Sequence, residues 1–472
     1  MPARVLIIAL DGADGALLDR WSADGTLRNL AALRARGAAT RLSAPAGVTD
    51  DALWASFQYA SSLGEHGRYH FLQRLDSGEM GMVFREETDR QSFWDALSIE
   101  GLHVAILDVP KCGSPRPLNG IHLVDWLVHG RYFDEPQSYP ESLSGEIVAQ
   151  FGPAPPTRCH YQGPPLSDDE VRETTANLRT SVALKRAAGL HYLRSEPWDL
   201  FVLGFKEGHC AGHHFWDFAD PAHPGHDPAR AASLPDPIRT IFLDLDAAVG
   251  DLVAAVGPDT AIAVFSTTDM VPNATLGHLM PGIVRRVRRR LSDTPLTRAV
   301  RYGVQLCFPT AHVMPPCSLL PYSDNCDALR VSPQWGLFRH TPGYERKKAA
   351  MLDRIESLLH DLTDVDTGRP AIAAIDRPSA TYPGKRAAAL PDLLIRYPAG
   401  AVPRAVVSAQ LGRIESERPK VRPGNHAPGG LLIFSGDTFA GASAIQDIGP
   451  LAAKALHATT RRPGVNRLFS GR

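Results

Sequence analysis

Six short apolar runs recur along the chain and predict buried β-strands. They lie at residues 4–10, 103–109, 120–127, 199–205, 261–266 and 430–436. A run that is apolar at nearly every position, rather than at alternate ones, is typical of a strand that is buried on both faces. The pattern therefore favours a parallel sheet that is covered on both sides.

Amphipathic helical patterns separate several of these runs. Two of them span residues 168–194 and 237–257. The first follows Ser167, with Glu170 three residues later, which is the arrangement of a capping box. Strands that alternate with helices predict an α/β fold, with a central, mostly parallel sheet and helices on both faces. In such sheets the chemistry collects at the carboxyl ends of the strands.

The segment 275–415 differs from the rest of the chain. It is rich in proline and arginine, and it contains one clear helical pattern, at 343–362. We interpret it as an insertion that caps the sheet, between a first core part at 1–274 and a return to the core at 416–472. The length of 472 residues agrees, because it exceeds the usual size of a single core.

A basic run lies within this insertion, at Arg285–Arg290. We interpret it as the solvated face of a helix that follows Pro281, with an anion-binding or partner surface as the alternative.

The overall charge excludes an electrostatic case for polyanionic partners. Fifty lysines and arginines face 51 aspartates and glutamates, for a formal net charge of −1. We therefore expect neither a nucleic acid polymer nor a membrane surface as partner. The sequence gives no indication of the oligomeric state.

The N-terminus and the cysteines bear on location. The first apolar run ends at Asp11, so it is too short for a signal peptide core or a membrane span. The six cysteines form no CxxC pair, which favours free thiols in a reducing compartment. We therefore expect a cytoplasmic protein.

Histidine and aspartate residues lie next to several of the predicted strands. Asp11 ends the first strand, His209 and His213 follow the strand 199–205, and His426 precedes the last strand. Imidazole and carboxylate groups suit zinc, manganese or iron. His209 and His213 are four residues apart, so on a helix they share one face and form a candidate ligand pair. For any one of these histidines, an ordinary hydrogen-bonded side chain is the alternative.

The stretch before the helix that contains Trp54 is a second candidate site. Thr49, Asp50 and Asp51 lie at the expected N-terminus of this helix, where exposed backbone N–H groups favour anions. A hydroxyl beside a carboxylate suits a nucleophile next to a metal ligand. The alternative is an ordinary helix cap made by Thr49.

Taken in order, these segments resemble the alkaline phosphatase superfamily, in particular its type I phosphodiesterase/nucleotide pyrophosphatase-like branch. The segments that carry the resemblance are VLIIALDGAD, LWASFQYASSLGEHGRYHF, DLFVLGFKEGHCAGHHFWDF, ALPDLLIRY and PGNHAPGGLLIFSG. The resemblance covers nearly the whole chain and depends on the order of the segments. It implies an alkaline phosphatase-like fold and a metal-dependent hydrolase of a phosphoester, of the phosphodiester or nucleotide-like kind, and therefore a small-molecule anionic substrate.

The resemblance also implies the roles of individual residues. The family binds two metal ions, and a Thr or Ser side chain attacks phosphorus in line. One ion, most readily zinc and otherwise manganese or iron, would take His209, His213 and His426. The other ion would take Asp11, the nucleophile and an Asp-His pair after the strand 261–266.

The sequence departs from the family pattern at the second ion. The residues after the strand 261–266 read STTD, so a gap-free alignment places Thr267 and Thr268 at the ligand positions. Asp269, one residue later, is then the candidate ligand. The site is therefore expected to hold one or two ions.

The nucleophile position is a second departure. Counted back from Trp54 without a gap, this position falls on Asp50, and Thr49 fills it only with a slip of one residue. We expect Thr49 as the nucleophile and Asp50 as a metal ligand. Two alternatives stay open, which are a single-metal enzyme of the same fold with another reaction, and a non-catalytic relative.

Substrate contacts are the least specified part of the site. Asp125 and His129 follow the strand 120–127, and we expect them to line the pocket. Arg330, in the insertion, is a candidate to meet an anion, with a structural arginine as the alternative.

Overall fold

The computed structural model describes most of the chain. The described residues are 4–45, 47–75, 79–86, 90–127, 133–159, 161, 163–292, 317–322, 325–331 and 343–459. Among them, no helix combines the length and the apolar character needed to span a membrane. The described cysteines are all buried, namely Cys112, Cys159, Cys210, Cys317 and Cys326.

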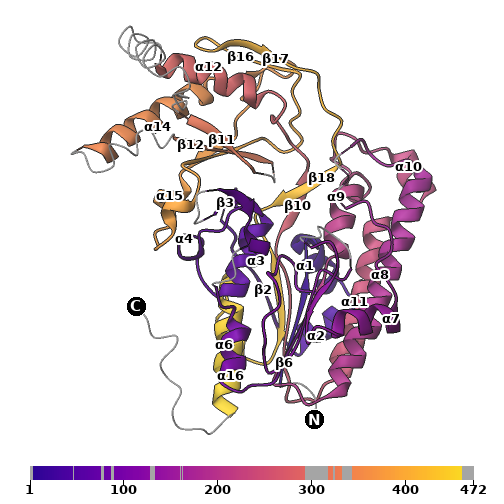
Figure 1. The fold of residues 1–472 in the computed structure, drawn as a ribbon. Helices are drawn as coiled ribbons and strands as arrows, with labels where there is room; N and C mark the ends of the chain where they lie inside the picture. Colours follow the sequence, from indigo (N-terminus) through magenta and orange to yellow (C-terminus); the bar gives the residue numbers. More distant parts are fainter. Residues whose placement is uncertain are drawn as a thin grey trace.

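An eight-stranded sheet forms the centre of the molecule (Figure 1), in the order β2-β19-β9-β1-β8-β5-β6-β7. The neighbours from β9 to β6 are all parallel, whereas β7, β19 and β2 join antiparallel at the two edges. The strands are β1 (Val5–Leu10), β2 (Gly37–Arg41), β5 (Val104–Leu107), β6 (Gly120–Val124), β7 (Gln137–Tyr139), β8 (Leu200–Phe205), β9 (Ala261–Ser266) and β19 (Leu431–Ser435). All six predicted strands are confirmed, and the predicted fold class with them.

Helices cover both faces of this sheet because its central strands are apolar on both sides. In β1, Leu6 and Ile8 belong to one hydrophobic core, while Val5 and Ile7 belong to the other. The first core packs under α1 (Gly15–Ala23), α2 (Arg28–Ala35), α7 (Leu143–Phe151), α8 (Asp168–Ser195), α9 (Glu207–Ala219) and α11 (Pro237–Ala254), with α10 (Pro228–Ser233) beside them. The second packs under α3 (Asp50–Tyr59), α6 (Phe93–Ile99) and α16 (Ile448–Thr459).

A second body sits above the carboxyl ends of the central strands (Figure 1) and has a hydrophobic core of its own. The chain leaves the first body through β10 (Asp269–Pro272) and returns through β18 (Gly424–Ala427), and these two strands pair antiparallel. Between them lie α12 (Met280–Ser292), β11 (Cys317–Leu320), β12 (Cys326–Val331), α14 (Tyr344–His360), β13 (Thr363–Asp364), β14 (Ala374–Asp376), α15 (Pro378–Thr381), β15 (Leu393–Arg396), β16 (Ala405–Ser408) and β17 (Gly412–Glu415). We call these elements the cap.

Short elements connect the larger ones. They are α4 (Leu63–His66), β3 (Leu72–Arg74), β4 (Met80–Met82), α5 (Val83–Glu86) and the 3₁₀ turns η2 (Ala387–Ala389) and η3 (Ile445–Asp447). The predicted helices at 168–194, 237–257 and 343–362 correspond to α8, α11 and α14.

The basic run Arg285–Arg290 lies on α12, as predicted, but part of it is used inside the cap. Arg286 donates a hydrogen bond to the carbonyl oxygen of Leu411, and Arg290 donates to Gln410. Arg288 donates to the carbonyl oxygen of Cys317 at 2.7 Å. These arginines therefore hold α12 against β11 and against the turn between β16 and β17.

A buried histidine on β6 makes stability depend on pH. His122 is buried, and neither of its ring nitrogens has a hydrogen-bond partner among the described residues. Burial lowers the pKa of His122 from 6.5 to about 3. As the pH falls below 6.5, the unfolded chain therefore takes up this proton before the folded protein does, and stability is lost.

We therefore expect His122→Leu to gain stability relative to the wild type as the pH falls. Below pH ~6.5 the gain is about 1.4 kcal/mol for each pH unit, and it levels off towards the low pKa of the folded state. Above pH ~7 both proteins lack the proton, so any difference there reflects packing alone. Urea unfolding at several pH values measures the difference, and a gap that does not change between neutral and acidic pH contradicts the prediction.

Candidate active site

The carboxyl ends of β1 and β8 bring the first site residues together. These strands are parallel with Leu10 opposite Phe205, so Asp11 lies beside the start of α9. Gly12 has φ +56°, and a Cβ atom there would lie 2.6 Å from the Cα of His209. Only glycine therefore lets the chain turn past α9 directly after Asp11.

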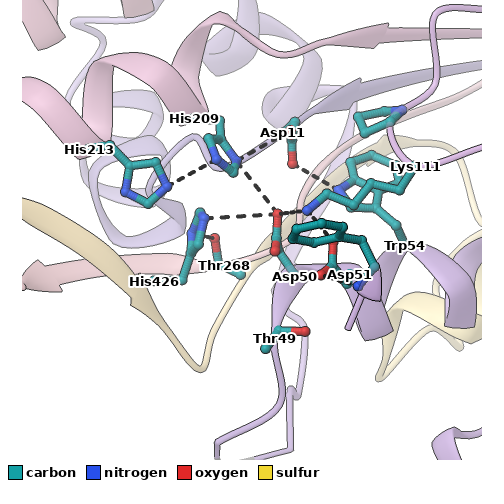
Figure 2. A network of polar contacts seen from close by, with 12 residues as sticks. Asp11, Thr49, Asp50, Asp51, Trp54, Lys111, His209, His213, Thr268 and His426 are labelled. Atoms are coloured by element: carbon teal, nitrogen blue, oxygen red, sulfur yellow. Dashed lines mark hydrogen bonds and ion pairs between the residues drawn. The ribbon is translucent and has the colours of Figure 1, made fainter. Parts of the chain in front are cut away.

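Three histidines converge at this edge (Figure 2). His209 and His213 come from one face of α9, and His426 comes from β18. All three are buried, and their ring centroids lie 4.5 to 4.6 Å apart. The Nε2 atoms of His209 and His213 are 3.0 Å apart. The prediction that these residues lie together is thus met by the geometry.

Hydrogen bonds orient two of the three rings. Nδ1 of His213 lies 2.9 Å from the carbonyl oxygen of Gly424. A carbonyl can only accept, so Nδ1 carries the proton and Nε2 presents its lone pair to the cluster. Nδ1 of His426 is 3.0 Å from the Thr268 hydroxyl, and its buried Nε2 has no hydrogen-bond partner among the described residues.

Burial disfavours the charged form of all three imidazoles. It lowers the pKa of His209 and of His213 well below the usual 6.5, and it also lowers the pKa of His426. The charge of Arg422 lowers the pKa of His213 further. Neutral imidazole is the form that binds metal.

The spacing of these rings suits a shared metal ion. Two histidine nitrogens that bind one tetrahedral zinc at about 2.0–2.1 Å lie roughly 3.3 Å apart. The observed 3.0 Å between the Nε2 atoms of His209 and His213 is close to this separation. Ligand atoms of all three histidines lie within 4.8 Å of one another. Three histidines with an open fourth position form a known type of catalytic zinc site.

Two carboxylates flank the histidines. Asp50, in the first turn of α3, places Oδ2 3.6 Å from Nδ1 of His209 and 3.9 Å from Nε2 of His426. Asp11 places Oδ2 3.4 Å from Nδ1 of His209, and its Oδ1 accepts a hydrogen bond from Trp54 at 2.8 Å. Burial, together with the charge of Asp50, raises the pKa of Asp11 to about 6.

Asp11 therefore faces the side of His209 that points away from the other two histidines. A carboxylate in this position orients a metal-binding imidazole through its other ring nitrogen. Asp11, Asp50 and His209 also form a second group of ligand atoms that lie within 4.8 Å of one another.

A lysine that sequence reasoning missed lies in the same cluster (Figure 2). Nζ of Lys111 is 2.8 Å from Oδ2 of Asp50, and it also contacts Oδ1 of Asp51. The Lys111 side chain is 5% exposed. Its position just after the predicted strand 103–109 was the available signal, because the carboxyl ends of the parallel strands meet at this edge.

Thr49 does not meet the histidines. Its hydroxyl donates a hydrogen bond to the carbonyl oxygen of Tyr69 at 2.7 Å, and it lies below Asp50 in Figure 2. Thr49 is the N-cap residue of α3 by backbone position, although its side chain makes no cap hydrogen bond. The residue that faces the histidines is Asp50, one position further on.

Asp269 is also turned away from the cluster. Its Oδ2 pairs with Arg41 at 2.5 Å, while the preceding Thr268 faces His426. Asp269 is the first residue of β10, whereas Thr268 lies in the connection between β9 and β10. Asp269 is therefore an ion-pair partner of Arg41 and not a ligand beside Asp11 and Asp50, which corrects the expectation from the sequence.

The predicted substrate contacts have other partners. Asp125 is buried, accepts a hydrogen bond from the backbone N–H of Phe133 at 3.3 Å and lies 4.0 Å from Nζ of Lys206. Arg330 donates to the carbonyl oxygens of Ala389 and Leu390 within the cap. These contacts make Arg330 a structural arginine. His129 lies outside the described residues.

A buried ionic network supports the start of α9 from below. Asp108 lies 2.8 Å from Nζ of Lys185 and 2.8 Å from Nζ of Lys206. Glu207, the first residue of α9, accepts a hydrogen bond from Ser181 at 2.6 Å and lies 3.6 Å from Lys185. Glu207 is therefore part of this network and does not join the histidines two residues later.

The sheet order, the cap and the cluster of histidine and aspartate at the carboxyl ends of the strands define an alkaline phosphatase-like α/β protein. The chain belongs to the type I phosphodiesterase/nucleotide pyrophosphatase family, because the sequence profile of that family matches residues 5–298, more than half of the chain. No curated protein sequence matches the chain.

Solved structures with the same fold cover almost the whole chain. Phosphonoacetate hydrolase from Sinorhizobium meliloti 1021, in complex with phosphonoacetate, has a TM-score of 0.50 and 12% identity over 96% of each chain. Murine ectonucleotide pyrophosphatase/phosphodiesterase 5, an inactive variant in complex with AMP, has a TM-score of 0.52 and 10% identity over 96% of this chain and 95% of the other. The family and these neighbours support a phosphoryl-transfer hydrolase.

Proposed function

We propose that the protein is a metal-dependent hydrolase of a phosphoester, and that His209, His213 and His426 hold one divalent ion, most readily zinc. The observation that carries the proposal is the convergence of three buried imidazoles at the carboxyl edge of the sheet. A bound divalent ion would supply Lewis-acid polarisation of a phosphoryl oxygen.

Asp50 is proposed as the general base. It occupies the position that the gap-free count gives to the family nucleophile, and its contact with Lys111 favours the ionised carboxylate. A carboxylate in that place accepts the proton of an attacking water. The water oxygen then bonds to phosphorus, the ester P–O bond breaks, and the leaving alkoxide takes a proton from solvent. No covalent phosphoenzyme forms on this route.

The neighbouring variants Asp50→Asn and Thr49→Val test this assignment. We expect Asp50→Asn to lower kcat by about 10²–10⁴-fold, the usual contribution of a general base. Thr49→Val is expected to keep kcat within a few-fold of wild type, because the Thr49 hydroxyl is bound to the Tyr69 carbonyl. Steady-state kinetics on a chromogenic phosphodiester gives both numbers.

The reverse result would assign the nucleophile to Thr49. If Thr49→Val is folded, as judged by circular dichroism, but inactive, the alkoxide mechanism of the family holds and the role of Asp50 as base fails. Trapping a phosphorylated enzyme during turnover would lead to the same conclusion.

The substrate class is tested with a panel. Phosphodiesters and nucleotide esters come first, because the family and the AMP complex of the murine neighbour support them. Phosphonoacetate belongs in the panel because the S. meliloti neighbour was solved with it. Binding of the ion without turnover of any of these compounds would favour a repurposed or non-catalytic relative. That alternative is supported by the threonines at 267 and 268.

A further inference from the structure

The position of Lys111 suggests an answer to how many ions the site holds. We propose that the Lys111 ammonium takes the place of a second metal ion, so that the protein binds one divalent ion per chain. The inference rests on the proposed function for its first ion, held by His209, His213 and His426.

The contacts of Lys111 are those of a cation held between acids. Its Nζ bridges Asp50, at 2.8 Å, and Asp51. Both carboxylates and the ammonium are almost fully buried, so their charges are poorly screened by water.

The charges of the cluster balance with one ion and one ammonium. Asp11, Asp50 and Asp51 together bring three negative charges when ionised. One divalent ion and the Lys111 ammonium bring three positive charges. A second divalent ion beside Lys111 would add uncompensated positive charge in a buried place, which is costly.

The second ion also lacks its own ligands. Thr268 contacts His426 instead, the Thr267 hydroxyl is buried without a hydrogen-bond partner among the described residues, and Asp269 pairs with Arg41. Neutral hydroxyl groups are poor substitutes for the carboxylate and imidazole that bind such ions. The segment 267–269 therefore offers the second metal position no strong ligand.

His209 cannot readily serve two ions. Its Nε2 faces His213, and its Nδ1 faces Asp11 and Asp50. Binding through both nitrogens would require the ring to lose its remaining proton, because a neutral imidazole has only one nitrogen with a free lone pair. The group formed by Asp11, Asp50 and His209 is thus incomplete once the three-histidine ion is bound.

The backbone is arranged to aim Lys111 into the cluster. Lys111 has φ +57°, a left-handed conformation that lysine rarely adopts. Gln58 of α3 holds this loop, donating hydrogen bonds to the carbonyl oxygens of Pro110 and Lys111, both at 3.0 Å. The helix that supplies Asp50 and Asp51 therefore also fixes the loop that carries their counter-charge.

Metal stoichiometry tests the proposal without any substrate. The full-length protein is saturated with zinc, dialysed, and analysed for metal by mass spectrometry. We expect one ion per chain for the wild type. We expect two for Lys111→Met, because the carboxylates of Asp11, Asp50 and Asp51 then have no ammonium between them and can hold a second cation themselves, without ligands from residues 267–269. Lys206→Met, which removes a buried lysine from the network around Asp108, is the control and should stay at one ion.

Each outcome separates the two proposals. Two ions in the wild type, or one ion in both the wild type and a folded Lys111→Met, would overturn the inference but leave a metal-dependent hydrolase intact. No ion in the wild type would overturn the proposed function itself, and the inference with it. If Lys111→Met does not fold, Lys111→Asn replaces it, since asparagine tolerates the left-handed backbone better than most residues.

Discussion

His213→Ala is expected to lose the bound ion and the hydrolytic activity together. His213 offers Nε2 to the cluster and is fixed by its hydrogen bond to Gly424, so alanine removes a ligand and leaves a gap between α9 and β18. Loss of a residue that only orients a metal ligand weakens metal binding by about 10–100-fold. Loss of the ligand itself should exceed about 100-fold.

The neighbouring residue gives a matched control. His214 is equally buried, but its Nε2 lies 2.7 Å from the carbonyl oxygen of Arg158, on another side of α9. His214→Ala should therefore keep the ion, whatever it does to stability. Zinc affinity measured by competition with a chelator, together with kcat on a phosphodiester, decides the matter. An unchanged affinity in His213→Ala would remove the three-histidine site from consideration.

The second large effect concerns stability, and we expect Asp108→Ala to cost about 3–5 kcal/mol of unfolding free energy. Asp108 is fully buried and pairs with Lys185 and Lys206, each at 2.8 Å. It also accepts hydrogen bonds from the backbone N–H groups of Trp126 and Leu127. Removing the carboxylate leaves two ammonium groups buried with one acid fewer between them, a severe loss.

Urea unfolding of Asp108→Ala against the wild type measures this cost. Glu415→Ala is the control, because Glu415 pairs with Arg413 on the surface, where such pairs contribute at most about 1 kcal/mol. A loss below about 1 kcal/mol for Asp108→Ala would mean that Lys185 and Lys206 find other partners. It would also mean that the network does not hold the start of α9.

The apolar runs of the chain were enough to predict six of the eight strands of the central sheet, whereas the edge strands β2 and β7 are not apolar runs and were missed. Strands such as 199–205 are apolar on both faces because helices cover both faces. A continuous run of apolar residues is therefore enough to predict that such a strand is buried. The same reasoning placed His209 and His213 at one edge, since the carboxyl ends of parallel strands meet there. His426 reaches this edge from β18, just before β19, which joins the sheet antiparallel to β9. The cap was harder, because its sheet joins β11, β12, β15 and β14 from distant parts of the chain.

The details of the site depended on information that local sequence does not carry. Thr49 and Asp50 are neighbours, and only the start of α3 decides which of them faces the histidines. Thr268 and Asp269 are likewise neighbours, in the loop before β10 and at its first residue, and only Thr268 faces His426. Lys111 escaped notice because a single lysine after a strand is chemically ordinary until its carboxylate partners, sixty residues earlier, are seen beside it.

The return strand β18 connects the cap directly to the histidine cluster. His426 lies on β18, the strand by which the chain returns from the cap to the first body, whereas His209 and His213 belong to α9 of that body. An ion bound by all three histidines would therefore join α9 to the strand that connects the cap to the first body. The affinity for the ion would then depend on the position of the cap, because any displacement of β18 would move one of the three ligands.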